Sequence, residues 1–261
     1  MRPATSLRLV ALSAFRDNYI WTLTDGKNAC VVDPGEARPV LDFLRANGIA
    51  LCAILNTHHH YDHVNGNAEL LEHFAVPVYG PRHEDIVEVS VPVGENDCVK
   101  IAALGLRFEV LDIPGHTAGH VAYYDANYLF CGDTLFACGC GRLFEGTPEQ
   151  MTASLAKLAA LPDATQVCCG HEYTLANIAF AQAVEPGNAA LAEREKRERE
   201  KRRAGLPTLP ALLADEHATN PFLRCEQAEV VAAATRHAGR PVDNPLAVFS
   251  VLREWKNNFA A

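Results

Sequence analysis

The pattern of hydrophobic and polar positions changes along this chain. From Leu7 to about Cys169, short apolar runs end in polar loops, and turns or occasional helical patterns separate them. The runs NACVVDPG, LCAILNTH, GLRFEVLDIPGHT, NYLFCGDTLF and ATQVCCGHE share this design. Short apolar runs bounded by turn residues are typical of buried strands. This part of the chain therefore predicts an α/β domain.

Helical periodicity interrupts these strands. Residues 37–48 place three apolar side chains on one face and end at an Asn-Gly pair, which predicts a helix. Residues 67–74 predict a second helix. Residues 147–161 predict a third, in which Thr147 precedes a proline at the first helical position.

After about His171 the strand-like runs disappear. Residues 177–200 and 225–239 predict helices that proline-rich segments connect. We therefore predict a metal-binding domain over residues 1–171 and a helical domain over residues 172–261. The charged stretch EREKREREKRR (193–203) places acids four residues before bases, the stabilising order on a helix. It is interpreted as a solvated helix face rather than a nucleic-acid site.

Composition narrows the functional classes. The chain has 261 residues, of which 49% are hydrophobic, and a formal net charge of −9. An acidic chain lacks the broad basic surface that nucleic acids and anionic membranes require, so neither is expected as a partner. Nine cysteines without a repeated spacing indicate reduced thiols and a cytoplasmic setting. Arginines interrupt the apolar residues of the segment 1–21, which we interpret as the first strand rather than a signal peptide.

The densest chemistry lies in the segment NTHHHYDHVNG (56–66). In an extended chain, side chains at positions i and i+2 point the same way, so His58 and His60 can hold one ion together. His59 faces the other side and is the weakest ligand candidate. Asp62 and His63 follow where the chain turns into the next helix. Imidazole and carboxylate ligands suit zinc, iron or manganese.

Further ligands follow other strands. His116, Asp133 and His171 each lie in a glycine-containing loop directly after an apolar run. Any one of them alone is interpreted more simply as a hydrogen-bonded surface residue or a turn cap, but together they complete two coordination spheres. One consistent partition places His58, His60 and His116 on one metal, Asp62, His63 and His171 on the other, and Asp133 between them. Two such ions about 3.5–4 Å apart would lower the pKa of a shared water to about 7, which is the chemistry of hydrolysis.

The motifs THHHYDH, GHTAGH and GDTLF resemble those of the metallo-β-lactamase superfamily. This resemblance implies an αββα sandwich fold. The segments AFRDNYIW, GCGRLFEGTPEQM, CGHEYT, LPTLP and ATNPFLR are similar to glyoxalase II, the hydroxyacylglutathione hydrolase family, over almost the whole length, including a C-terminal helical domain. The family resemblance implies hydrolysis of S-D-lactoylglutathione to D-lactate and glutathione, the second step of methylglyoxal detoxification.

The resemblance also assigns residues. It implies two divalent metal ions, most simply zinc with iron or manganese as alternatives, on the seven ligands above, with Asp62 and Asp133 also catalytic. It implies that glutathione is bound by the following residues: Arg142, Phe144, Tyr173, Arg253 and Lys256. Family members often have lysine at position 142 and tyrosine at position 144, so Phe144 lacks a hydroxyl that would contact glutathione. We expect a monomer.

The mechanism implied is attack of a metal-bridging hydroxide on the thioester carbonyl. The metal held by His58, His60 and His116 would polarise the carbonyl oxygen, while Asp62 orients the water. The alternative is a glutathione persulfide dioxygenase with a single iron, although such proteins tend to lack the C-terminal ATNPFLR segment. A nuclease of the same superfamily would need a basic arm. A metal-binding protein without catalysis would be expected to lack a ligand.

Overall fold

The computed structural model describes residues 7–259, and these form two compact units. The first runs up to Asp112 and includes Ala118–Gly132. The second consists of Ile113–Thr117 and the chain from Asp133 onward. This division follows contacts in space. It does not test the predicted boundary at residue 171, which divides the sequence into two consecutive segments and stays a prediction.

The first unit is built on a sheet in which neighbouring strands follow the sequence order β1 to β6. The strands β1, β2 and β3 are antiparallel, whereas β3, β4, β5 and β6 are parallel. Their bounds are β1 Arg8–Ala14, β2 Asn18–Thr24, β3 Asn28–Val32, β4 Ala50–Leu55, β5 Val78–Pro81 and β6 Val91–Val93. The predicted first strand is thus confirmed from Arg8, and residues 1–6 lie outside the described part.

Helices α1 (Ala37–Asn47) and α3 (Asn67–His73) connect the parallel strands and cover one face of this sheet. Val40 and Leu44 of α1 pack with Ile20 and Val31 of the sheet in one buried cluster. Parallel strands need such crossovers, and the carboxyl ends of parallel strands meet at one edge. The loops after β3 and β4 are therefore neighbours.

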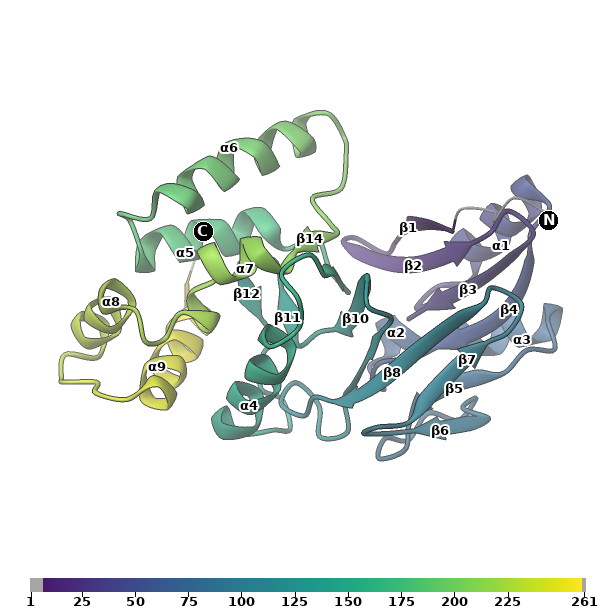
Figure 1. Ribbon diagram of the computed structural model, residues 1–261, viewed down its shortest axis with the longest axis horizontal. Coiled ribbons are helices and arrows are strands. Elements are labelled where there is room, and N and C mark those ends of the chain that lie inside the picture. The colour runs from purple at the N-terminus through teal and green to yellow at the C-terminus, as the bar shows by residue number, and fades with distance from the viewer. Residues whose placement is uncertain (1–6, 260–261) are drawn as a thin grey trace. The chain divides into compact units, whose positions relative to one another are not determined.

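The opposite face of this sheet is buried as well, since every residue of β2 is buried. A second antiparallel sheet of the same unit covers it, with neighbouring strands in the order β10, β9, β8 and β7 (Figure 1). The bounds are β7 Cys98–Ile101, β8 Leu106–Asp112, β9 Val121–Tyr124 and β10 Tyr128–Gly132. The hydroxyl of Tyr123 on β9 donates to the carbonyl of Asn56 after β4, at 2.9 Å, and joins the sheets.

The second unit contains a short hairpin, β11 (Leu135–Phe136) with β12 (Gly139–Cys140), and the pair β13 (Gln166–Cys169) with β14 (Ala211–Leu212). Helices make up most of the rest (Figure 1). Their bounds are α4 Pro148–Ala159, α5 Thr174–Val184, α6 Ala189–Arg203, α7 Leu213–Thr219, the 3-10 helix η1 Pro221–Leu223, α8 Ala228–Ala238 and α9 Pro245–Asn257.

The predicted helices are present, except that residues 177–200 fall in two helices, α5 and α6, which residues 185–188 separate. Two further details differ from expectation. The two-residue strand β14 lies in the part expected to be helical only. Helix α6 is not solvated all round, because Arg194 is 2% exposed and Glu198 is 3% exposed. Periodicity could not reveal this because α6 has charged residues on every face. In the described part of the chain, no helix combines the length and the apolar character needed to span a bilayer.

Helix α4 begins with a complete capping box, in which the Thr147 side chain accepts from the Gln150 backbone and the Gln150 side chain accepts from the Thr147 backbone. We expect Thr147→Ala to lower the free energy of unfolding by about 1 kcal/mol because a first-turn amide loses its acceptor. Urea denaturation measures this. Thr152→Ala in the same helix is the control, since the Thr152 hydroxyl only bonds back to Pro148 and should be close to neutral. Equal losses in both variants would contradict the role of the cap.

Candidate metal centre and substrate pocket

Four of the predicted ligands lie together in the first unit. His58 and His60 follow β4, and the short helix α2 (Tyr61–Val64) carries Asp62 and His63. The ring centroid of His58 is 4.8 Å from that of His60 and 4.2 Å from that of His63. The Asp62 carboxylate lies 3.7 Å from Nε2 of His63. The loop thus gathers three imidazoles and one carboxylate.

A buried carboxylate that the sequence analysis did not select organises these ligands. Asp33 follows β3, is 5% exposed and has a φ of 52°. Its Oδ1 accepts from the Thr57 amide at 2.7 Å, and its Oδ2 accepts from the Thr57 hydroxyl at 2.7 Å. The same Oδ2 lies 3.0 Å from Nδ1 of His63. A non-glycine residue at positive φ is uncommon, and this one is held by three hydrogen bonds.

These contacts decide where the imidazole protons reside. A carboxylate accepts, so Nδ1 of His63 carries the proton and Nε2 keeps its lone pair. The Thr57 hydroxyl donates to Asp33, so it accepts from Nδ1 of His58 at 3.0 Å. Each Nε2 is therefore in the form that ligates a metal, and the residues fit a zinc, iron or manganese ion. Asp33, His58 and His63 have ligand atoms within 4.8 Å of one another, but Asp33 faces the Nδ1 side and is interpreted as a support rather than a ligand.

Asp62 is also held in place. Asn18, at the start of β2, donates from Nδ2 to Oδ2 of Asp62 at 2.9 Å and to its backbone carbonyl at 3.3 Å. Gly35 lies against the same backbone, where an added Cβ would lie 1.9 Å from the Asp62 oxygen. Only glycine permits this approach.

Two other histidines of this unit, His59 and His120, lie beside the candidate ligands and make further contacts. The amide and Nδ1 of His59 both lie against Oε2 of Glu84. Oε1 of Glu84 also accepts from the Gly119 amide at 3.2 Å. His120 stacks on His58, with ring centroids 4.5 Å apart and planes inclined by 14°. These contacts fix the loop on both sides of His58.

The other three predicted ligands lie together in the second unit. Oδ2 of Asp133 is 3.6 Å from Nε2 of His116 and 3.2 Å from Nε2 of His171. Nδ1 of His116 faces the carbonyl of Arg142 at 2.9 Å, which again leaves Nε2 for a metal. An added Cβ on Gly141 would lie 1.9 Å from the Asp133 carbonyl oxygen. This unit therefore presents a carboxylate oxygen between two imidazoles.

A pocket of about 410 Å³ opens beside these ligands, within the second unit. All five residues expected to contact substrate line it, together with two of the ligands: His116, Asp133, Arg142, Phe144, Tyr173, Arg253 and Lys256. Phe144 is 62% exposed and packs edge-on against His116. The ring of Tyr173 stacks on His171 at 4.7 Å with an interplanar angle of 5°. The pocket wall therefore contains candidate metal ligands, aromatic rings and cationic side chains.

The two C-terminal cations have different surroundings. Arg253 is 5% exposed, and its Nη1 donates to the carbonyl of Cys140 at 2.6 Å and to that of Gly141 at 3.3 Å. Its guanidinium therefore supports the backbone of the pocket wall. Lys256 donates to the carbonyl of Ala176 at 3.1 Å, and burial together with the charge of Arg253 lowers the pKa of Lys256 to about 8.

The cysteines near this pocket are not activated nucleophiles. Burial raises the pKa of Cys140, and burial raises the pKa of Cys138 to about 12. A nucleophilic cysteine needs a lowered pKa, because the thiolate is the reactive form.

Sequence reasoning missed Asp33, Glu84 and Asn18. Asp33 offered a signal, because it ends an apolar strand just as the selected ligands do. Glu84 and Asn18 offered none, since their partners lie 25 and 44 residues away in the chain.

Comparison with known proteins identifies two matching segments. Residues 15–171 match the metallo-β-lactamase superfamily, and residues 172–259 match the hydroxyacylglutathione hydrolase C-terminus. A protein of Alkalilimnicola ehrlichii named hydroxyacylglutathione hydrolase is 57% identical, over 95% of this chain and 98% of its own length.

Solved structures share the fold. BLEG-1 B3 metallo-β-lactamase is similar with a TM-score of 0.62 and 24% identity, covering 84% of this chain and 99% of its own. TTHA1623, solved in a di-iron-bound form, has a TM-score of 0.52 and 31% identity, covering 63% of this chain and 91% of its own. The fold is thus the αββα sandwich of the metallo-β-lactamases with a C-terminal helical part, as predicted.

We expect Asp33→Ala to weaken metal binding by about 10–100-fold, because His63 loses its acceptor and the Thr57 hydroxyl, which accepts from His58, loses the carboxylate that orients it. Competition with a chromogenic chelator and metal analysis of the purified protein measure this directly. Asp42→Ala is the control, since Asp42 is an exposed residue of α1 that pairs with Arg38. Unchanged metal affinity in a folded Asp33→Ala protein would rule out the supporting role.

Proposed function

The chain belongs to the hydroxyacylglutathione hydrolase family of the metallo-β-lactamase superfamily, and we propose that it hydrolyses S-D-lactoylglutathione and related S-2-hydroxyacylglutathiones to the 2-hydroxy acid and glutathione. For the lactoyl substrate the acid is D-lactate, and the reaction is the second step of methylglyoxal detoxification. The observation that carries the proposal is the pocket in which two metal-ligand residues share walls with cations and aromatic rings.

The metal site is proposed to use both groups of ligands. Neither the four residues of the first unit nor the three of the second complete two coordination spheres, whereas seven donors suffice. We assign His58, His60 and His116 to one metal, Asp62, His63 and His171 to the other, and Asp133 to both. The donors are nitrogen and carboxylate oxygen only, which suits two zinc ions, with iron or manganese as alternatives.

The remaining pocket residues are proposed to bind glutathione. Its two carboxylates need cationic partners, and Arg142 and Lys256 supply them at the pocket wall. The phenol of Tyr173 supplies a hydrogen bond beside His171. Arg253 takes part chiefly by holding the carbonyls of Cys140 and Gly141, and Phe144 offers an apolar ring in place of a phenol.

The reaction adds a water oxygen to the thioester carbonyl and breaks the C–S bond. When bound, the metals supply hydroxide at neutral pH and polarise the carbonyl. Asp62, held by Asn18, accepts and orients the water proton, and Asp133 is positioned by its contacts with His116 and His171. The glutathione thiolate departs with little acid assistance, because thiols ionise near pH ~8.5.

The glutathione persulfide dioxygenase alternative has less support. The C-terminal segment that matches the hydroxyacylglutathione hydrolase family carries Tyr173, Arg253 and Lys256. A single iron per chain with oxygen uptake on glutathione persulfide would favour the alternative. A cytoplasmic location and a monomeric state remain predictions from the sequence.

We expect the purified protein to hydrolyse S-D-lactoylglutathione rapidly and a chelator to abolish this activity. Asp133→Ala should lower kcat by about 10²–10³-fold or more, because the residue proposed to hold both metals is lost. Loss of thioester absorbance measures the rate, and metal analysis accompanies it. Asp243→Ala, an exposed aspartate before α9, is the control. No hydrolysis by metal-loaded protein would reject the substrate.

The lowered pKa of Lys256 predicts a pH dependence of substrate affinity. The ammonium form binds a carboxylate, and free protein loses this proton as pH rises through about 8. KM should therefore be constant below about pH 7 and rise by up to ~tenfold per pH unit above 8. Initial rates between pH 6.5 and 9 measure this. In Lys256→Arg the rise should disappear, because a guanidinium stays protonated. Identical profiles would show that Lys256 does not titrate against the substrate.

A further inference from the structure

The hairpin of β11 and β12 joins two functional positions of the second unit. Asp133 lies two residues before β11, and Arg142 lies two residues after β12. The turn between the strands has only two residues, and Cys138 in it adopts a φ of 54°. The conformation of this hairpin therefore sets how Asp133 and Arg142 are placed in the pocket that both line.

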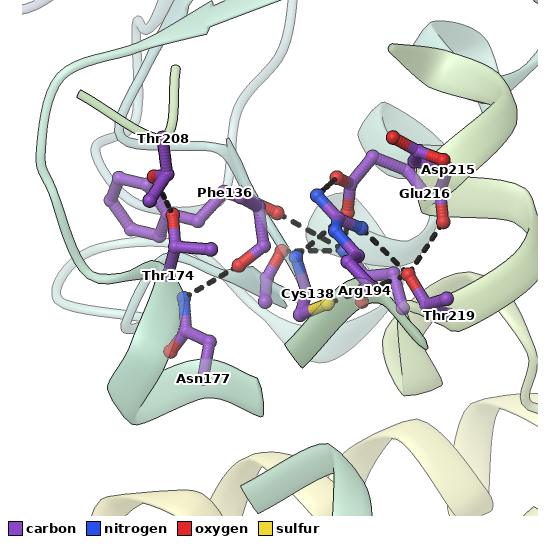
Figure 2. A network of polar contacts seen from close by, with 12 residues as sticks. Phe136, Cys138, Thr174, Asn177, Arg194, Thr208, Asp215, Glu216 and Thr219 are labelled. Atoms are coloured by element: carbon purple, nitrogen blue, oxygen red, sulfur yellow. Dashed lines mark hydrogen bonds and ion pairs between the residues drawn. The ribbon is translucent and has the colours of Figure 1, made fainter. Parts of the chain in front are cut away.

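Side chains from the helical part hold the hairpin by its backbone (Figure 2). Nδ2 of Asn220 donates to the carbonyl of Phe136 at 3.1 Å and to that of Gly139 at 2.9 Å. Nδ2 of Asn177 on α5 donates to the carbonyl of Ala137 at 3.0 Å. These amides replace the strand partners that such a short hairpin lacks on its outer edges.

The amide of Cys138 is held by a charged acceptor. It donates to Oε2 of Glu216 on α7 at 2.8 Å, and Nδ2 of Asn220 donates to the same oxygen at 3.0 Å. Glu216 is 0% exposed. A buried carboxylate is costly unless it is paired, so this contact needs a counter-charge.

Helix α6 supplies that counter-charge. Nη2 of Arg194 donates to Oε1 of Glu216, and Nη1 of Arg194 donates to the hydroxyl of Thr219 at 2.6 Å (Figure 2). The Thr219 hydroxyl in turn lies 3.4 Å from the sulfur of Cys138. Arg194 is buried, although most residues of helix α6 are charged. The ion pair thus connects α6 and α7 to the tip of the hairpin.

We propose that the Arg194–Glu216 ion pair is a positioning device for the substrate pocket: it fixes the hairpin tip through the Cys138 amide and thereby places Arg142 for glutathione. Buried ion pairs contribute little to net stability on average, so stability alone does not explain this one. The hairpin offers an amide donor, which a hydrophobic pair of equal volume could not satisfy. The kinetic consequence of this proposal rests on the proposed function, whereas the structural consequence does not.

The effect should fall on affinity more than on turnover. A bound metal would also hold Asp133, whereas Arg142 is placed by the hairpin and by the contact of its carbonyl with His116. A loosened tip therefore displaces the glutathione contact first.

The test compares Arg194→Met, Glu216→Gln and the double variant in metal-loaded, full-length protein. Each single variant leaves one buried group without its partner, whereas the double variant keeps an amide oxygen for Cys138 without an unpaired charge. Glu198→Gln is the control, because Glu198 is a buried carboxylate of the same helix that pairs with Arg197 and Lys201 instead.

Three readouts are measured: the dissociation constant of an S-alkylglutathione, which has no thioester to hydrolyse, kcat with S-D-lactoylglutathione, and hydrogen exchange of the Cys138 amide. In each single variant we expect about tenfold weaker binding, with kcat changed less than about threefold. Exchange of the Cys138 amide should accelerate at least about tenfold. The double variant should recover most of the loss, and Glu198→Gln should match the wild-type protein.

Unchanged binding and exchange in folded single variants would overturn the proposal. The same changes in Glu198→Gln would also overturn it, because the effect would then belong to general destabilisation. If the single variants do not fold, the double variant decides: wild-type exchange with recovered binding supports the positioning role, and fast exchange with weak binding overturns it. If the protein does not hydrolyse lactoylglutathione but exchange of the Cys138 amide is slow and depends on the Arg194–Glu216 ion pair, the result supports the positioning role of the pair. The same result rejects the proposed substrate.

Discussion

A metal-ligating imidazole almost always donates its other ring N–H to an acceptor, which fixes its tautomer and orientation, and both units supply such acceptors. In the first unit, Asp33 and Thr57 accept from Nδ1 of His63 and of His58. In the second, the carbonyl of Arg142 faces Nδ1 of His116. The supporting groups come from a strand end in one case and from a hairpin exit in the other. The fold is therefore needed to set the protonation of the ligands as well as their positions.

The same need for acceptors and donors explains the polar interior of the second unit. A two-residue hairpin leaves backbone groups without strand partners, and buried backbone groups must be paired. These partners lie 40 or more residues after the backbone groups that they contact, and they are the side chains of Asn177, Asn220, Glu216 and Arg253. The C-terminal part of the chain thus has two roles. It lines the pocket, and it holds the backbone of the β11–β12 hairpin.

Sequence reasoning selected the candidate ligands because histidines and aspartates after apolar strands form a local pattern. The structure brings four of these candidates together in the first unit and three in the second. Sequence reasoning reached α4 through Thr147 and the proline that follows. It could not reach Glu84 or Asn18, whose roles depend on pairings between distant segments. It also misjudged α6, because alternating acids and bases look the same on a solvated face and on a face that buries one arginine. Only tertiary packing separates Arg194 from its exposed neighbours.

Two cations of one helix, Arg253 and Lys256, differ in their surroundings at the pocket wall. They lie three residues apart on α9, and both line the pocket. Arg253 is buried against the backbone carbonyls of Cys140 and Gly141, so it fixes the wall. Burial of Lys256, together with the charge of Arg253, lowers the pKa of the lysine to about 8. An anionic ligand at this wall would therefore meet an ammonium group that the ligand's own charge stabilises.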